Sequence, residues 1–175
     1  LYENQIGDHE YRQTCRFCLG KNLVDVMNLG EQPLAGAFLK QQDFLIEKFY
    51  PLVLMFCKDC FLVQIRNMVS PDILFRKNYF FYSSAIETLV IHFNDFADEI
   101  YERFLSGLSK PSIVEIGCND GVLLKPLSNL GVKAIGVDPA TNVVNSIGPS
   151  NFTIYNNYFN FEVAQQIRED HGQQD

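Results

Sequence analysis

The pattern of apolar and polar positions divides the carboxyl-terminal part of the chain into alternating strands and helices. Residues 112–116 form a short run, apolar apart from a serine and a glutamate, of the kind that becomes a buried parallel strand. Residues 132–137 and 152–155 predict two more strands, and the helical patterns at 142–147 and 161–169 follow them. This rhythm predicts a Rossmann-like, doubly wound α/β sheet.

The segment before this sheet has helical character. Residues 86–105 place apolar side chains at helical spacing, and Ser84 and Glu87 have the spacing of a capping box at the helix start. A shorter helix is expected near Pro71, because proline suits the first helical position. His92 lies among polar residues of the long helix, so we interpret it as a solvated side chain and not as a catalytic base.

The amino-terminal part is richer in β-type patterns. Residues 50–56 and 61–65 predict strands, and the residues before them mix short apolar runs with glycine and proline. We therefore expect three parts: a small β-rich lobe over 1–68, a helical connection over 69–110, and the sheet domain over 111–175.

Four of the five cysteines form two pairs, Cys15-x-x-Cys18 and Cys57-x-x-Cys60. Such pairs can place four thiolates around one zinc ion in a closed tetrahedron that contains no water, which makes the zinc structural. The 38 residues between the pairs exceed the spacing of a minimal zinc ribbon, so they must carry structure of their own. Disulfides are the main alternative; a redox pair is less expected, because neither pair opens a strand–helix unit.

The turn after residues 112–116 is the best candidate for a ligand site. Gly117 and Gly121 permit close approach of the backbone to a ligand, but Asn119 occupies the position where a phosphate-binding loop has glycine. Asp138 ends the next strand, where a carboxylate can accept both hydroxyls of a ribose. The arrangement favours adenosine, although glycines and an acid at this spacing also occur in other α/β proteins.

Two motifs carry a family resemblance. The run V-E-I-G-C-N-D-G, with V-D-P after the next strand, resembles class I S-adenosylmethionine-dependent methyltransferases. The phrase N-L-G-x-Q-P-L-A-x-A-F over residues 28–38 resembles the zinc lobe of the sugar C-methyltransferases. This resemblance implies S-adenosylmethionine as cofactor and methylation of a carbon next to the keto group of a nucleotide-linked deoxysugar.

In the resembled family, a tyrosine-rich segment ending in Ser-Ser helps to close the site. Tyr79, Ser83 and Ser84 match that segment, whereas Phe81 and Tyr82 depart from it, and ordinary packing is the alternative interpretation.

Asn157 and Tyr158 follow the third expected strand and are expected near the adenine, with a solvent-facing loop as the equal alternative. The family usually has an acid at the place of Asn157. The residues expected to bind the cofactor are Glu115, Gly117, Asn119, Asp120, Gly121, Asp138, Asn157, Tyr158, Tyr79 and Ser83.

Charge and hydropathy narrow the class of protein. A net charge of -7 and a sequence pI near 4.9 argue against nucleic acid as partner. No apolar run reaches the roughly 18 residues that span a bilayer, and the start lacks the features of a secretion signal, so we expect a cytoplasmic protein. The competing function is a non-catalytic zinc-ribbon interaction module fused to a nucleotide-binding half-domain.

The sheet domain has three expected strands, whereas a methyltransferase core of the resembled family has seven. We therefore expect an amino-terminal fragment, without turnover of its own and with weak cofactor binding at best. The catalytic base is unknown, because the family's acid–base segment lies further along its chain. The strand at 112–116 is expected to lie at an uncovered apolar edge, which favours self-association or a poorly ordered carboxyl-terminal part.

Overall fold

The computed structural model describes residues 5–6, 8–36, 38–76 and 79–175. The chain forms two compact units, Leu1–Leu74 and Phe75–Asp175. The second unit thus includes most of the segment expected as a helical connection. Ala37, which falls within the motif at 28–38, lies outside the described residues. None of the helices in the described ranges has the length and apolar character needed to cross a bilayer.

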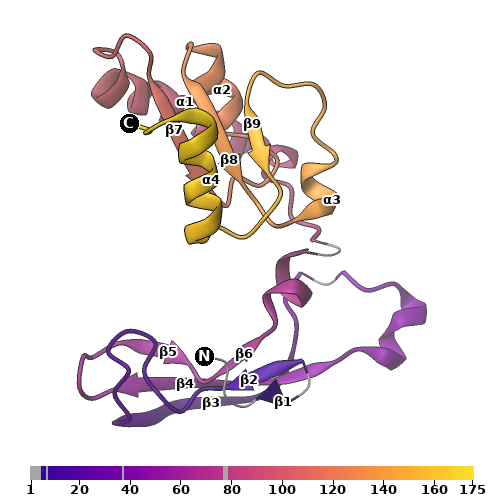
Figure 1. Ribbon diagram of the computed structural model, residues 1–175. Helices are drawn as coiled ribbons and strands as arrows, with labels where there is room; N and C mark the ends of the chain where they lie inside the picture. Colours follow the sequence, from indigo (N-terminus) through magenta and orange to yellow (C-terminus); the bar gives the residue numbers. More distant parts are fainter. Residues whose placement is uncertain (1–4, 7, 37, 77–78) are drawn as a thin grey trace. The chain divides into compact units, whose positions relative to one another are not determined.

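The first unit contains two small antiparallel sheets (Figure 1). One sheet has the order β1-β2-β6 and the other β3-β4-β5. Their strands are β1 (Gln5–Ile6), β2 (His9–Tyr11), β3 (Leu23–Pro33), β4 (Phe49–Cys57), β5 (Val63–Ile65) and β6 (Asn67–Val69). A 3-10 helix, η1 (Gln41–Ile46), lies between β3 and β4.

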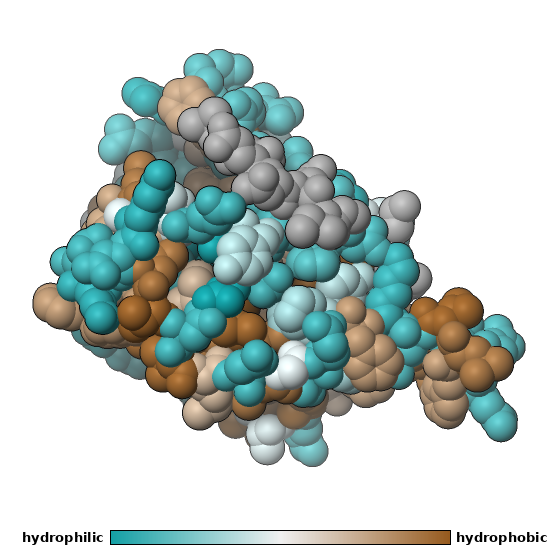
Figure 2. All heavy atoms as spheres, turned by 90° about the horizontal axis from the view of Figure 1, so that it is seen from below, coloured by the Kyte–Doolittle hydropathy of each residue, from teal (hydrophilic) through white to brown (hydrophobic). Residues whose placement is uncertain are grey.

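Little apolar surface is buried in this unit. The side chains of β4 alternate between buried and partly exposed positions, and Val53, Met55 and Cys57 are buried. Nearly all of β3 is exposed. Leu45 in η1 is 97% exposed. Figure 2 shows apolar side chains exposed at several places on the face that it draws. All three apolar core clusters of the described residues belong to the second unit. The first unit therefore needs another source of stability.

The second unit is built on a parallel sheet of order β7-β8-β9, as the strand–helix rhythm predicted. Helices α1 and α2 cover one face of the sheet and α4 covers the other (Figure 1). The helix η2 (Asp72–Arg76) spans the boundary between the two units. The elements of the second unit are η3 (Ser83–Ala85), α1 (Glu87–Ile100), η4 (Tyr101–Leu105), β7 (Ser112–Ile116), α2 (Leu124–Asn129), β8 (Lys133–Val137), α3 (Thr141–Val144), β9 (Thr153–Tyr155) and α4 (Phe161–His171).

The expected capping box at the start of α1 is wrong. The cap position is Ile86, and no side chain caps the helix there. Residues 83–85 form the separate turn η3, and the Ser84 N–H donates to Asp120 Oδ2 at 3.0 Å. The reason is tertiary: the serine backbone is bonded to the glycine turn, so Ser84 is not at the helix end.

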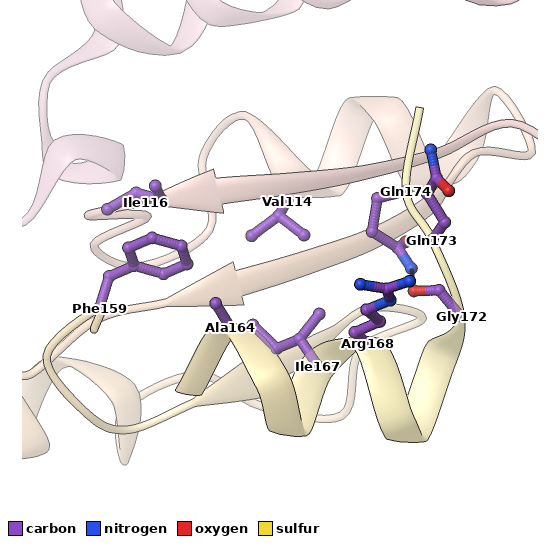
Figure 3. Close-up of a pocket in the computed structure, with 9 residues that line it drawn as sticks. All are labelled: Val114, Ile116, Phe159, Ala164, Ile167, Arg168, Gly172, Gln173 and Gln174. Atoms are coloured by element: carbon purple, nitrogen blue, oxygen red, sulfur yellow. Dashed lines mark hydrogen bonds between the residues drawn. The ribbon is translucent and has the colours of Figure 1, made fainter. Parts of the chain in front are cut away.

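Strand β7 lies at the edge of the described sheet, with β8 as its one neighbour in the ladder. Beside it opens a cavity of about 440 Å³, drawn in Figure 3 between the strand and α4. Ile116 is 61% exposed there. At the other end of the strand, the Asp175 N–H donates to the Ser112 carbonyl at 3.1 Å, and the Asp175 carboxylate accepts the Ser112 N–H. The lining residues are Val114, Ile116, Phe159, Ala164, Ile167, Arg168, Gly172, Gln173 and Gln174.

Candidate functional site

The four paired cysteines come together as the spacing predicted. Their Sγ atoms all lie within 4.8 Å of one another, and the Cys15–Cys60 and Cys18–Cys57 Sγ pairs are each 3.6 Å apart. Zinc–sulfur bonds of about 2.3 Å in a tetrahedron place thiolates about 3.8 Å apart, so the cluster fits zinc. All five cysteines of the chain are free thiols, which disagrees with the disulfide alternative.

The two cysteine pairs have the same backbone geometry. The Leu19 N–H donates to the Cys15 carbonyl, and the Phe61 N–H donates to the Cys57 carbonyl in the same way. Leu19 and Phe61 both have positive φ, at 62° and 65°. Each turn thereby folds back on itself and directs two thiols toward the same point.

Gln64 supports this cluster and was missed by sequence reasoning. Its side chain is 6% exposed, and its Oε1 accepts the Arg16 N–H at 3.0 Å, next to Cys15. The pKa of Cys15 is lowered to about 6: burial raises it, but the N–H groups of Cys18 and Phe17, then the Cys60 and Gln64 side chains, lower it further. A thiolate favoured in this way suits a metal ligand.

The glycine turn is held on the end of β8 by Asp138. The Asn119 N–H donates to Asp138 Oδ2 and the Ala140 N–H to Asp138 Oδ1, both at 2.8 Å. Asp138 is 6% exposed, so one lone pair on each oxygen is already used by the backbone. The carboxylate therefore shapes the turn.

The two glycines of the turn serve different purposes. Both have φ of +76°, but a Cβ at Gly117 would meet open space, whereas a Cβ at Gly121 would come within 2.7 Å of the Phe152 ring. The small size of Gly121 is thus required by a side chain of the same unit. Asn119 has φ of 50°, a conformation that asparagine tolerates better than most residues.

Three carboxylates gather around this turn. Burial, then the negative charges of Asp138 and Asp120, raise the pKa of Glu115 to about 7. Glu115 Oε2 and Asp120 Oδ1 are both buried without a hydrogen-bond partner among the described residues. The causes of the Glu115 shift include no basic side chain, so the cluster favours a cationic ligand.

The tyrosine–serine segment lies against the same turn. The Ser83 N–H donates to Asn119 Oδ1 at 2.9 Å, and Asn119 Nδ2 donates to the Phe81 carbonyl at 2.9 Å. Ser83 is buried, while Tyr79 is half-buried. The structure therefore brings Ser83 to the glycine turn, whereas Tyr79 is bonded to Asn142 in α3.

Asn157 and Tyr158 follow β9, at the same end of the sheet as the glycine turn. The Asn157 side chain accepts the Tyr158 N–H, and the Tyr158 ring lies 4.8 Å from the Arg76 guanidinium. Sequence reasoning missed the adjacent Asn156, whose Nδ2 donates to the Asp138 carbonyl at 2.9 Å. Asn156 links the end of β9 to the end of β8.

The raised pKa of Glu115 predicts a pH effect on stability. Between pH 4.5 and about 7 the unfolded state loses this proton while the folded state keeps it, so the free energy of unfolding falls as pH rises. Glu115→Gln removes this effect and should be more stable than the unchanged chain at pH 8 by up to about 3 kcal/mol, with little difference near pH 5. Denaturant unfolding of both proteins at the two pH values measures it. If the free energies of unfolding of Glu115→Gln and the unchanged chain differ by the same amount at both pH values, the raised pKa of Glu115 is contradicted.

Sequence comparison finds two similarities to known proteins. Residues 15–75 match the sequence model of a family described as a putative zinc binding domain. The C-methyltransferase NovU of Streptomyces niveus is 31% identical to the chain over 160 residues, which make up 90% of this chain and 37% of NovU. The chain thus spans little more than a third of the length of this relative.

The match of residues 15–75 agrees with the geometry of the cysteine cluster. Both matches agree with the resemblance predicted from the motifs: the chain is similar to a C-methyltransferase, and its residues 15–75 are similar to a putative zinc binding domain.

Proposed function

We propose that the glycine turn binds S-adenosylmethionine and that the protein methylates a carbon next to the keto group of a nucleotide-linked deoxysugar. The carboxylate cluster carries the first part of this proposal. S-adenosylmethionine bears a sulfonium and an ammonium group, both of which are attracted to the charges of Glu115, Asp120 and Asp138. The pyrophosphate of a nicotinamide dinucleotide is repelled by the same charges.

The residues of the turn divide the binding task. Gly117 leaves open space above the backbone, and the second lone pairs of the Asp138 carboxylate suit the two ribose hydroxyls. Asn157 and Tyr158 are proposed to lie near the adenine, with Tyr79 and Ser83 closing the site. When bound, the cofactor would supply an electrophilic methyl group, and the Glu115 carboxylate would attract its positively charged end.

The zinc is proposed to be structural, held by Cys15, Cys18, Cys57 and Cys60. Four thiolates complete a tetrahedron and leave no position for water or substrate. The thiols must stay reduced to bind the metal, which suits a cytoplasmic location.

A comparison of two ligands tests the cofactor. The zinc-loaded chain should bind S-adenosylmethionine, and bind it more tightly as pH rises through about 7 and Glu115 ionises, while it should not bind nicotinamide dinucleotide. Glu115→Gln should lose the pH dependence. Preference for the dinucleotide would instead support a nucleotide-binding module without methyl-transfer chemistry.

The edge of β7 beyond Ser112, which is bonded to Asp175, is proposed to mediate self-association of this chain. Its exposed Ile116 and half-buried Val114 leave an apolar strand without the lysine or proline that usually protects an edge. Ile116→Lys should convert a dimer into a monomer, and Phe161→Lys, which changes another exposed residue outside the cavity, should not. Sedimentation of the three proteins at tens of micromolar measures it. If the unchanged chain is itself a monomer at this concentration, the proposed self-association is contradicted.

A further inference from the structure

Asn142 in helix α3 is bonded to a segment 63 residues earlier in the chain. Its Oδ1 accepts the Tyr79 N–H at 3.1 Å, and its Nδ2 donates to the Tyr79 carbonyl at 2.7 Å. The same Nδ2 donates to the Tyr82 hydroxyl at 3.1 Å. One carboxamide thus fixes both the backbone of Tyr79 and the side chain of Tyr82.

Asn119 holds the other end of this segment. Its Oδ1 accepts the Ser83 N–H, and its Nδ2 donates to the Phe81 carbonyl. The Ser84 N–H donates to the neighbouring Asp120 carboxylate. Asn119 lies in the turn after β7, and Asn142 lies in the helix that begins shortly after β8. The segment is therefore fastened to both loops that meet at the carboxyl end of the sheet, where ligands of such sheets bind.

The direction of the bond to Tyr82 has a chemical consequence. Because Asn142 Nδ2 is the donor, the Tyr82 oxygen acts as acceptor and its own proton is left free. Among the described residues, the Tyr82 hydroxyl takes part in no further hydrogen bond. Tyr82 lines a cavity of about 600 Å³ that also includes Ser84, Asp120 and Gly121.

We propose that Asn142 is a positioning residue, which presents the Tyr82 hydroxyl as a hydrogen-bond donor to an oxygen or nitrogen acceptor of the ligand bound at the glycine turn. This inference rests on the proposed function, since it takes S-adenosylmethionine as that ligand. Asn142 keeps the segment in place before the ligand arrives, so less ordering remains to be done on binding. Tyr82 makes the contact and Asn142 acts through it.

A double-mutant cycle separates this role from general support of the fold. Asn142→Ala and Tyr82→Phe are each expected to weaken S-adenosylmethionine binding by about fivefold or more, as loss of one hydrogen bond does. The double variant should bind no more weakly than Asn142→Ala, because the two residues act as one unit. Asn145→Ala, at an exposed position just after α3, serves as the matched control and should bind like the unchanged chain.

Hydrogen exchange without ligand gives an independent readout. Peptides covering residues 79–84 should exchange about fivefold faster in Asn142→Ala and at the normal rate in Asn145→Ala. Unchanged affinity in Tyr82→Phe, or losses that add in the double variant, would overturn the inference. Failure of the unchanged, zinc-loaded chain to bind S-adenosylmethionine would overturn the proposed function itself, whatever the exchange rates show.

Discussion

Removal of zinc is expected to unfold the first unit of the chain and to leave the parallel sheet of the second unit folded. The first unit buries few apolar side chains, and two of the most deeply buried, Cys15 and Cys57, are thiols of the cluster. In small zinc modules the apparent binding free energy of the metal is about 10–16 kcal/mol, and much of it is folding free energy. The folding free energy that is lost with the ion should therefore exceed the stabilisation that the small apolar core provides.

Chelation and one substitution test this result. The chain should contain one zinc per molecule, and Cys57→Ser should contain none and show exchange of the β3–β4 amides as in an unfolded segment. Cys118→Ser is the matched control, because Cys118 is a buried thiol that packs with Leu124 and Ala134 in the second unit. A first unit that stays folded without metal would contradict the structural role of zinc.

Replacement of Asp138 by alanine is expected to produce the largest loss of cofactor affinity from a single change. Charge-assisted hydrogen bonds to the ribose account for about 1.5–3 kcal/mol, or roughly 10- to 150-fold in the dissociation constant. The variant also leaves the Asn119 and Ala140 N–H groups without their acceptor, which loosens the turn. The effect should therefore fall at the upper end of that range.

Two controls separate the contact from the charge. Asp138→Asn keeps one acceptor oxygen and should lose less affinity than alanine. Asp95→Ala removes the same charge from an exposed position on α1 and should leave affinity unchanged. Equal binding by Asp138→Ala and the unchanged chain would show that the ribose acid is misassigned.

The sequence predicted those features that depend on local spacing. The two cysteine pairs and the run at 112–116 are patterns within a few residues, and the structure places them in a thiol cluster and in β7. Helix α4 begins at Phe161 as the apolar periodicity predicted, and the Asn160 side chain caps it by accepting the Val163 N–H. Local chemistry and tertiary packing agree at these places.

The features that escaped prediction depend on contacts between distant residues. Ser84 has the spacing of a helix cap, but a bond to Asp120, 36 residues away, takes precedence. The close approach of Gly121 to the Phe152 ring likewise joins residues that are distant in the sequence. Asn142 looks like an ordinary helix residue until Tyr79 is placed beside it. No periodicity or motif in a single sequence records such pairings.

The most direct test of the account is a titration of the zinc-loaded, isotope-labelled chain with S-adenosylmethionine, followed by nuclear magnetic resonance of the backbone amides. We expect the largest shifts at residues 117–121, at 138–140 and in the segment 79–84, and none of them with nicotinamide dinucleotide. This experiment detects binding even when it is weak. Absence of shifts in the glycine turn at millimolar S-adenosylmethionine, or equal shifts with the dinucleotide, would contradict it.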